Sequence, residues 1–363
     1  MDRKLASVQL IRNIEPIKDA DAIEKATVLG WEVVIAKKDN LKIGDFVVYI
    51  ETDSIVPEKP EYEFLRDRKF RIRTIRLRGQ ISQGLVLPLT VLPLKRTGYV
   101  EGEDVTQLLG ITKYLSPTEQ TEARLADEAI AREKNRIKRF FMKNKWFRRL
   151  FAKEKRGFPK FITKSDEDRI QLFPNICELE KDTLFTVTEK LDGQSGTWFL
   201  VKEKSWFRTK YRFGVCSRNI YRKTPDNSSY WKIARQYKIE DALKKLIGKE
   251  SFVAIQGEII GEGIQDNKYK IKGIDMYAFN LILPSGRVNQ SILELNMTRF
   301  GLKTVPRLEY NFRLKNSIPE MVEYAKGQST VLDIPREGIV VRNYDKKLSF
   351  KVINPLFLLK YNE

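Results

Sequence analysis

The stretch Leu184-Phe185-Thr186-Val187-Thr188-Glu189-Lys190-Leu191-Asp192-Gly193 sets the organisation of the second half of this 363-residue chain. Apolar and hydroxyl residues alternate from Leu184 to Thr188, which predicts a β-strand. The Asp-Gly pair that follows favours a turn, so the strand would present Lys190 at the mouth of a site. A lysine held there can act as a covalent nucleophile, although a hairpin turn with a solvated lysine also fits this short pattern.

Further polar and aromatic groups stand beside strand-like runs downstream of Lys190. They are Arg218, Glu258, Phe279, Glu337 and Lys351. Each alone is typical of a strand end or an apolar core. In this order, with Lys190 as motif I, they resemble motifs Ia, III, IIIa, IV and V of the covalent nucleotidyltransferases.

The residue types suit the chemistry of such a transfer. Joining a lysine amine to the α-phosphorus of a nucleotide needs a neutral amine, cations beside the phosphates and a metal that helps pyrophosphate to leave. Lys351 and Arg218 can hold phosphate, and we expect them to lower the pKa of a neighbouring lysine. Glu337 is a hard oxygen ligand suited to Mg²⁺ or Mn²⁺.

Composition limits the classes of function. The chain carries 67 Lys and Arg against 48 Asp and Glu, a net charge of +19, which favours a polyanionic partner, nucleic acid before membrane. Its length favours two domains. No apolar stretch approaches the length of a membrane span and no signal-like segment opens the chain, so we expect a cytoplasmic protein with no membrane partner. Histidine is absent, which excludes Ser-His-Asp hydrolysis and His-ligated metals, and Cys177 and Cys216 are too few for a disulfide framework or a zinc site.

The first hundred or so residues predict a small β-barrel, an OB-like RNA-binding domain over residues 1–112. Short strand-like runs separated by turn signals carry this prediction, at 6–11, 25–29, 32–36, 46–51, 70–77 and 84–87. Basic and apolar residues alternate in the run Lys69 to Arg78, and the phase slips at Thr74, which predicts a bulge. Its basic residues, with Arg71, Arg73 and Arg76, could bind a phosphate backbone, and a solvated outer face fits equally well.

Residues 113–157 are predicted to form a basic helical linker. Its second half, Arg132 to Arg156, carries twelve Lys or Arg residues interleaved with Phe and Trp. Such a segment suits nucleic acid, calmodulin-like partners or membrane surfaces, but an aromatic stripe docked on a flanking domain is favoured.

Residues 158–363 predict an adenylyltransferase (nucleotidyltransferase) domain of the α+β class with largely antiparallel sheets. Ser165 is a candidate N-cap, followed by acidic residues, near the start of this module. Further helices are expected at 230–247, 291–300 and 317–326, where apolar residues recur at helical spacing.

The order of the modules resembles one family of RNA ligases. Only twelve residues follow Lys351, too few for another domain. DNA ligases and capping guanylyltransferases place an OB domain after motif V, whereas here the apparent barrel precedes motif I. The chain therefore resembles the ATP-dependent RNA ligases with an N-terminal OB domain, sometimes counted as the fifth RNA ligase group. The phrases Gly30-Trp31, Gly44-Asp45, Arg78 to Leu85 and Asp166 to Gln171 look like that family's.

The resemblance implies an ATP-grasp-like nucleotidyltransferase domain and a three-step reaction. ATP would react with Lys190 to give a covalent lysyl-AMP, with Mg²⁺ or Mn²⁺ as cofactor. The AMP would pass to an RNA 5′-phosphate, and a 3′-OH would then attack that phosphate. The implied partner is RNA with 3′-OH and 5′-phosphate ends, in a nicked duplex, and the implied enzyme is a monomer.

The resemblance also implies the roles of the site residues. Glu189, Arg218 and Glu258 would bind the nucleotide, the last two at its sugar, and Phe279 would stack on adenine. Glu337 would contact metal-bound water, and Lys351 would contact the α-phosphate. Arg169 and Lys164 are weaker candidates for the distal phosphates.

One position departs from the family pattern. Motif V in relatives often has a second lysine two residues after the first, and here that residue is Ile353. Either Lys351 serves both roles or another cation, such as Lys360, compensates.

Two other classes of function stay open at this point. One is a DNA-joining or capping-type nucleotidyltransferase, and the other is a non-catalytic RNA-binding protein with a ligase-like core. Within the favoured class, the N-terminal module is expected to serve RNA more than ATP.

Overall fold

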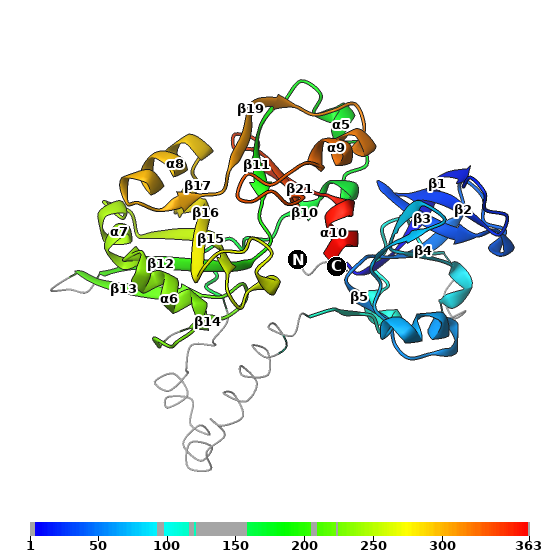
Figure 1. Ribbon diagram of the computed structural model, residues 1–363, viewed down its shortest axis with the longest axis horizontal. Helices are drawn as coiled ribbons and strands as arrows, with labels where there is room; N and C mark the ends of the chain where they lie inside the picture. Colours follow the sequence, from blue (N-terminus) through cyan, green and yellow to red (C-terminus); the bar gives the residue numbers. More distant parts are fainter. Residues whose placement is uncertain are drawn as a thin grey trace, which may run out of the picture.

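A computed structural model describes residues 4–92, 98–115, 120, 158–204, 209–222 and 224–361. Two sheet-rich modules stand side by side in Figure 1: an N-terminal module within residues 4–115 and a second module within residues 158–361. The predicted basic helix from Arg132 to Arg156 lies outside the described residues. None of the helices in the described ranges is long and apolar enough to cross a bilayer.

The N-terminal module is a half-barrel of antiparallel strands. Its elements are β1 (Ala6–Pro16), β2 (Ile23–Val28), β3 (Trp31–Ala36), η1 (Lys37–Asp39), β4 (Phe46–Ile50), β5 (Ser54–Ile55), η2 (Pro60–Arg68), β6 (Thr74–Leu77), β7 (Gln80–Gln83), β8 (Leu85–Pro88), η3 (Leu89–Val91), α1 (Thr106–Leu109) and β9 (Thr112–Lys113). The main sheet has the order β3-β2-β1-β4-β8, and β7 reaches β3 where the Val34 N–H donates to Ser82 Oγ at 3.0 Å. Successive residues of β4 enter two cores on opposite faces, since side chains alternate along a strand.

The prediction of one strand over 70–77 is wrong for the first half of that range. β6 begins only at Thr74, because residues 69 and 70 take left-handed φ values of 52° and 56° after η2. Arg71 consequently turns inward and is largely buried, whereas Arg76 on β6 is exposed. The predicted basic residues therefore do not share one face of a strand.

The second module consists of two largely antiparallel sheets with helices packed on them, which confirms the α+β class. Its strands are β10 (Asp168–Arg169), β11 (Leu184–Lys190), β12 (Gln194–Lys204), β13 (Thr209–Cys216), β14 (Tyr221–Arg222), β15 (Phe252–Gly261), β16 (Ile274–Leu283), β17 (Gly286–Arg287), β18 (Lys303–Thr304), β19 (Arg307–Arg313), β20 (Gly338–Asn343) and β21 (Leu348–Ile353). Its helical elements are η4 (Ile170–Leu172), α5 (Ile176–Leu179), α6 (Ser229–Gln236), α7 (Ile239–Leu246), η5 (Gln265–Asn267), α8 (Gln290–Arg299), α9 (Ile318–Ala325) and α10 (Pro355–Tyr361). The smaller sheet has the order β10-β21-β20-β11-β19, and the larger one runs β14-β13-β12-β15-β16-β17 with β18 beside β16.

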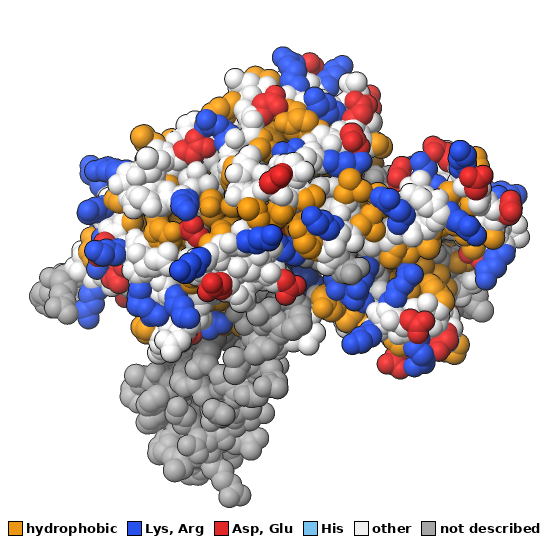
Figure 2. Space-filling view, viewed as in Figure 1, with side chains coloured by type: hydrophobic (Ala, Val, Ile, Leu, Met, Phe, Trp, Pro, Cys, Tyr) orange, Lys and Arg blue, Asp and Glu red, His pale blue; other side chains and the backbone are white. Residues whose placement is uncertain are grey.

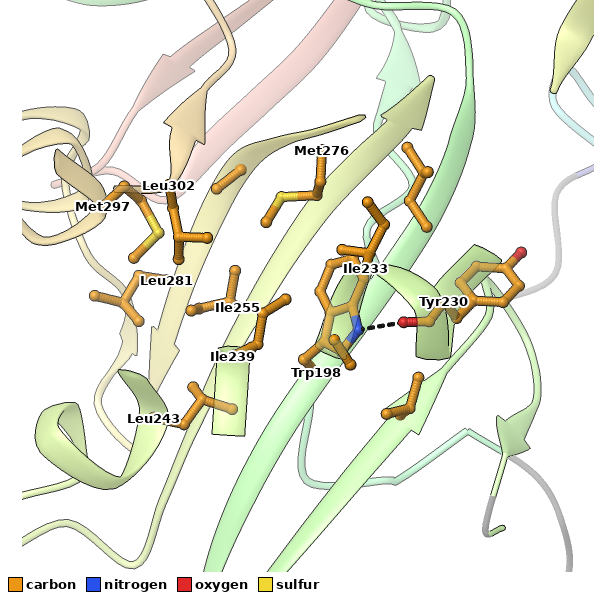
Figure 3. Close-up of a cluster of buried hydrophobic side chains, with 14 of the residues drawn as sticks. Trp198, Tyr230, Ile233, Ile239, Leu243, Ile255, Met276, Leu281, Met297 and Leu302 are labelled. Carbon is orange, nitrogen blue, oxygen red and sulfur yellow. Dashed lines mark hydrogen bonds between the residues drawn. The ribbon is translucent and has the colours of Figure 1, made fainter. Parts of the chain in front are cut away.

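A large apolar core joins the larger sheet to α6 and α7. Trp198 and Ile255 on the sheet face Ile233 and Leu243 on the two helices (Figure 3). The indole Nε1–H of Trp198 donates to the Tyr230 carbonyl at 3.0 Å, so its polar group is satisfied within the core. This core covers one face of the larger sheet. Polar residues of β12 and β15 therefore lie on the opposite face.

Two helix predictions need correction. The helix expected over 230–247 is two helices, because Lys238 takes a left-handed φ of 47° between α6 and α7. Ser165 does not cap a helix: its hydroxyl lies 3.3 Å from Ser195 Oγ, and the chain continues into β10 instead. The helices expected at 291–300 and 317–326 are present as α8 and α9, and Ser317 caps α9.

The two modules are in direct contact. The Gly30 N–H donates to the Gln171 carbonyl at 3.1 Å across the boundary. A Cβ at position 30 would lie 2.7 Å from Ile318 Cδ1, so the close approach depends on glycine. The C-terminal helix α10 lies at the same boundary in Figure 1 and packs against β6. Residues of both modules can therefore face one pocket.

We expect Leu243→Ala to destabilise the second module by about 2–5 kcal/mol, because Leu243 is fully buried and its loss leaves a cavity. Urea unfolding followed by tryptophan fluorescence measures the change. Leu295→Ala on α8, where the side chain is 74% exposed, is the matched control and should shift the free energy of unfolding by no more than about 0.5 kcal/mol. Equal effects in the two variants would contradict the core described above.

Candidate active site

A pocket of about 590 Å³ opens between the two sheets of the second module, with one wall from the N-terminal module. Of the residues expected at a site, those that line it are Arg71, Arg169, Glu189, Lys190, Arg218, Glu258, Phe279, Glu337 and Lys351. Residues that are distant in sequence thus meet at one cavity. Lys164 is not part of the described lining, and its Nζ lies 3.4 Å from Asn219 Oδ1 instead.

The centre of the pocket is an ion pair between Lys190 and Glu337. Lys190 is the last residue of β11 and pairs in register with Gly338, the first residue of β20, so Glu337 stands directly beside it. The Lys190 Nζ donates to both carboxylate oxygens of Glu337, at 2.7 and 2.6 Å. The antiparallel register of these two strands therefore sets the position of the amine.

Two more carboxylates surround the amine. Glu258 on β15 is half-buried and lines the pocket, and its Oε2 accepts from Ser195 Oγ at 3.1 Å. Asp192, in the turn after β11, accepts from the Lys268 Nζ at 2.5 Å, and its backbone N–H donates to Tyr269 Oη at 2.9 Å. The surroundings of Lys190 are consequently acidic.

These acids determine the ionisation of the pocket. Burial acts to lower the pKa of Lys190, but the charges of Glu337 and Glu258 outweigh it and leave that pKa above the ordinary value. The expectation that cations lower the pKa of Lys190 is therefore wrong for this arrangement. Burial raises the pKa of Glu258 to about 8, and burial together with the charge of Glu337 raises the pKa of Asp192 to about 6.

Arg218, which the sequence analysis expects at the sugar of a nucleotide, is held by a partner that the sequence did not indicate. Arg218 follows β13, and its Nη2 and Nε lie 2.5 and 3.2 Å from the two carboxylate oxygens of Asp166. Burial acts to raise the pKa of Asp166, but the charge of Arg218 outweighs it and lowers that pKa. A ligand that uses Arg218 must therefore share it with Asp166.

Phe279 and Val340 line the wall where a planar group could stack. Arg342 supports this wall: its Nη1 donates to the Phe279 carbonyl at 3.1 Å and its Nη2 donates to Glu167 at 3.1 Å.

The side chain of Glu189 is engaged elsewhere, since its Oε2 accepts from both the N–H and the hydroxyl of Thr330 at 2.9 Å. Contact of Glu189 with a ligand would thus use its main chain.

Cations gather at the boundary between the modules. Arg169 on β10 and Lys351 on β21 are neighbours in register. Asp53 bridges the modules: its Oδ1 accepts from Arg71 Nη2 at 2.9 Å, and its Oδ2 lies 3.5 Å from Arg169 Nη2. The Arg71 guanidinium also stacks on Tyr114, 3.5 Å from the ring centroid. This end of the pocket suits an anion with several negative charges.

The carboxylates fit a hard divalent cation held largely through water and ligand phosphates. Glu337, Glu258 and Asp192 supply oxygen donors of the kind that Mg²⁺ and Mn²⁺ prefer. In the described parts of the chain, no cluster of three or more acidic or thiol side chains forms a closed metal cage.

Sequence reasoning overlooked several residues of this pocket. Asp192 belongs to the same short motif as Lys190, and its interpretation as a turn former hid its carboxylate. Lys268 and Asp53 carry no local pattern, because their partners lie 76 and 116 residues away, at Asp192 and Arg169 respectively. Only the three-dimensional structure brings these side chains to the pocket.

Comparison with known proteins places this pocket in context. A family model described as an OB-fold domain matches residues 5–89, and one described as RNA ligase matches residues 183–360. A comparison with curated proteins gave no match.

Solved structures of the Naegleria gruberi RNA ligase resemble the whole chain. The apo form of an Asp-to-Ala mutant is 32% identical, with a TM-score of 0.79, and the match covers 99% of this chain and 98% of that chain. The same ligase with pyrophosphate is 33% identical, with a TM-score of 0.79 and 99% of both chains covered. A Glu-to-Ala mutant with ATP and Mn is 32% identical, with a TM-score of 0.79, covering 99% of this chain and 100% of that chain.

We expect Glu337→Gln to lower the pKa of Lys190, because it removes the charge that outweighs burial while it keeps the size of the side chain. Competitive acetylation at mildly alkaline pH, read by mass spectrometry, should then show faster labelling of Lys190. Lys303, which pairs with Asp275 at 2.6 Å, is the internal control and should label at an unchanged rate. Unchanged labelling of Lys190 would show that Glu337 does not hold its proton.

Proposed function

This chain belongs to the RNA ligase family and is an ATP-dependent RNA ligase, and we propose that it works through a lysyl-AMP formed on Lys190. The observation that carries this proposal is the half-buried lysine at the end of β11, which is paired with Glu337 and lines a pocket of nucleotide size. Its N-terminal half-barrel and second module act, in this proposal, as the RNA-binding and adenylyltransferase domains expected from the sequence.

In the first step, the Lys190 amine attacks the α-phosphorus of ATP, a nitrogen–phosphorus bond forms, and the bond to pyrophosphate breaks. The amine must first lose the proton that its pairing with Glu337 stabilises. Glu337 would help to hold a Mg²⁺ or Mn²⁺ ion, largely through water, and the ion would supply positive charge that stabilises the phosphates. Glu337 would therefore change partner when ATP and the metal bind.

The residues that line the pocket suggest contacts for the base and the sugar of the nucleotide. Adenine stacks on Phe279, and Glu258 accepts from the ribose hydroxyls, an assignment supported by the place of both residues in the pocket lining. Arg218 contributes to the sugar while Asp166 holds its guanidinium. Glu189 contributes through its main chain.

The cationic end of the pocket receives the phosphates. Lys351 contacts the α-phosphate, and Arg169 contacts the distal phosphates from the neighbouring strand. Arg71 faces the same space from the N-terminal module, so this module takes part in the reaction with ATP as well as with RNA. Lys164 lies outside the described lining, but its Nζ contacts Asn219, which lines the pocket, so Lys164 stays a weaker candidate for the distal phosphates.

The later steps use RNA with a 5′-phosphate and a 3′-OH, favoured in a nicked duplex that holds the two ends together. The 5′-phosphate oxygen attacks the lysyl-AMP phosphorus and frees Lys190; the 3′-OH then attacks the activated phosphate and releases AMP. Lys and Arg side chains spread over both modules and gather along their boundary in Figure 2, which suits a nucleic acid that crosses from one module to the other. Arg76, which is exposed on β6, belongs to this outer surface in the proposal, whereas Arg73 is half-buried and reaches it only in part. We propose a monomer as the acting species, and the two free, buried cysteines suit a reducing cytoplasm.

The central test is covalent labelling with α-labelled ATP and Mg²⁺ or Mn²⁺, followed by a denaturing gel. The parent protein should acquire label, and Lys190→Ala should acquire none, because the attacking amine is gone. Lys244→Ala is the control, since Lys244 is exposed on α7, pairs with Glu240 and lies outside the described pocket lining, so it should label as the parent does. Undiminished label in Lys190→Ala would reject the assignment of the nucleophile, and absence of label in the parent would favour a non-catalytic RNA-binding protein.

A second test addresses the N-terminal wall. Arg71→Ala should slow lysyl-AMP formation by on the order of 10- to 100-fold, because a charge-assisted contact to phosphate is worth about 1.5–3 kcal/mol. Arg76→Ala, exposed on β6 of the same module, is the matched control and should adenylylate at the parent rate. Single-turnover rates at saturating and limiting ATP measure both. If Arg71→Ala reacts with ATP like the parent but seals RNA poorly, its role lies with RNA alone.

A further inference from the structure

Lys268 is a buried cation directly behind the nucleophile's turn. Its Nζ lies 2.5 Å from Asp192 Oδ2, and the two side chains are only 5% and 8% exposed. On its other side, the same Nζ lies 4.9 Å from the ring centroid of Tyr361 and 5.2 Å from that of Phe357, both on α10. Aromatic faces stabilise a cation in such a position, so the amine is held from two sides.

The loop that carries Lys268 is built to hold Asp192. Residues 265, 266 and 267 take left-handed φ values of 44°, 56° and 47°, which are unfavourable for side chains other than glycine. Asn267 stabilises this conformation, because its side chain exchanges two 3.0 Å hydrogen bonds with the backbone of Ile271. The next residue after Lys268, Tyr269, accepts from the Asp192 N–H. Two consecutive residues thus fix the same aspartate through its carboxylate and its backbone.

This arrangement decides which acid pairs with Lys190. Asp192 follows Lys190 by two residues, in the turn after β11, and its carboxylate is buried like that of Glu337 and lines the same pocket as Glu337 and Glu258. A buried carboxylate without a cation is costly, so a released Asp192 would seek the nearest ammonium group. The Lys190 amine is such a group, because it lines the same pocket and its charge acts on Asp192, and it must be free to exchange Glu337 for ATP.

We propose that Lys268 is a positioning residue for lysine adenylylation: it holds the Asp192 carboxylate so that Lys190 keeps Glu337 as its ion-pair partner. This inference rests on the proposed lysyl-AMP route. It also gives the C-terminal helix a role in the first step, because α10 supplies the aromatic rings under Lys268. Ile353, where the second motif V lysine of relatives is missing, lies in one apolar cluster with Phe357 and Tyr361. Lys268 therefore places a positive charge beside Phe357 and Tyr361, in the cluster where Ile353 replaces the second lysine of relatives.

The test measures single-turnover formation of lysyl-AMP in the full-length protein. Lys268→Met should slow the rate at saturating ATP by on the order of 10- to 100-fold, as removal of an outer-shell partner commonly does, with little change in the ATP concentration for half-maximal rate. Lys268→Arg should recover most of the rate, because a guanidinium can keep both the carboxylate and the aromatic contacts. Lys303→Met is the matched control: Lys303 also pairs with an aspartate, Asp275, and lies over a tyrosine ring, but it is outside the described pocket lining.

A double-mutant comparison separates positioning from folding. In an Asp192→Asn background, Lys268→Met should cause no further loss of rate, because Lys268 acts through the Asp192 carboxylate. The double variant buries no unpaired charge, so it keeps the test decisive even if Lys268→Met alone folds poorly. A parent-like rate in folded Lys268→Met, or an equal loss with and without the Asp192 carboxylate, overturns the inference. Failure of the parent protein to form lysyl-AMP would instead overturn the proposed function.

Discussion

The pairing of Lys190 with Glu337 is the interaction on which the rest of the site depends. These residues are 147 positions apart, and the antiparallel register of β11 and β20 places them side by side. The two sheets of the second module enclose this contact, and helices pack on these sheets. A lysine in such a place is a poor nucleophile while the pair is intact, because burial alone cannot overcome the carboxylate that holds its proton. In the proposed reaction, this pair would protect the resting amine, and activation would require that Glu337 gain another partner.

The pocket separates opposite charges along its length. Carboxylates surround the amine at one end, and Arg71, Arg169 and Lys351 stand at the other. A nucleotide with its phosphates at the cationic end places the α-phosphorus at the border between the two, next to the amine. The carboxylates around Lys190 suit hard divalent cations. Such a cation would be held by these carboxylates together with the phosphates of a ligand. In the proposed function, this charge pattern would orient the nucleotide before the amine reacts.

The contact between the modules makes the N-terminal half-barrel part of this arrangement. Asp53 accepts from arginines of both modules, and Gly30 permits backbone contact with Gln171. A module expected to grip RNA consequently reaches the phosphate end of the pocket as well. The ion cluster of Asp53 with Arg71 and Arg169 therefore connects the N-terminal module to the cationic end of the pocket.

The sequence by itself determined the chemistry and its order along the chain. Lys190, Glu258, Glu337 and Lys351 each stand in or beside a strand with a recognisable local pattern, and their joint order, with the barrel placed before them, was sufficient to indicate a ligase of RNA. The tertiary structure alone decided the partners. Lys268 with Asp192, Asp166 with Arg218 and Asp53 with Arg71 are pairings between segments distant in sequence, and each depends on strand register and on left-handed residues such as those at 69 and 70, which turn Arg71 inward. Local patterns report what one segment prefers, whereas the ionisation of a buried lysine depends on the charges that other segments bring within a few ångströms of it.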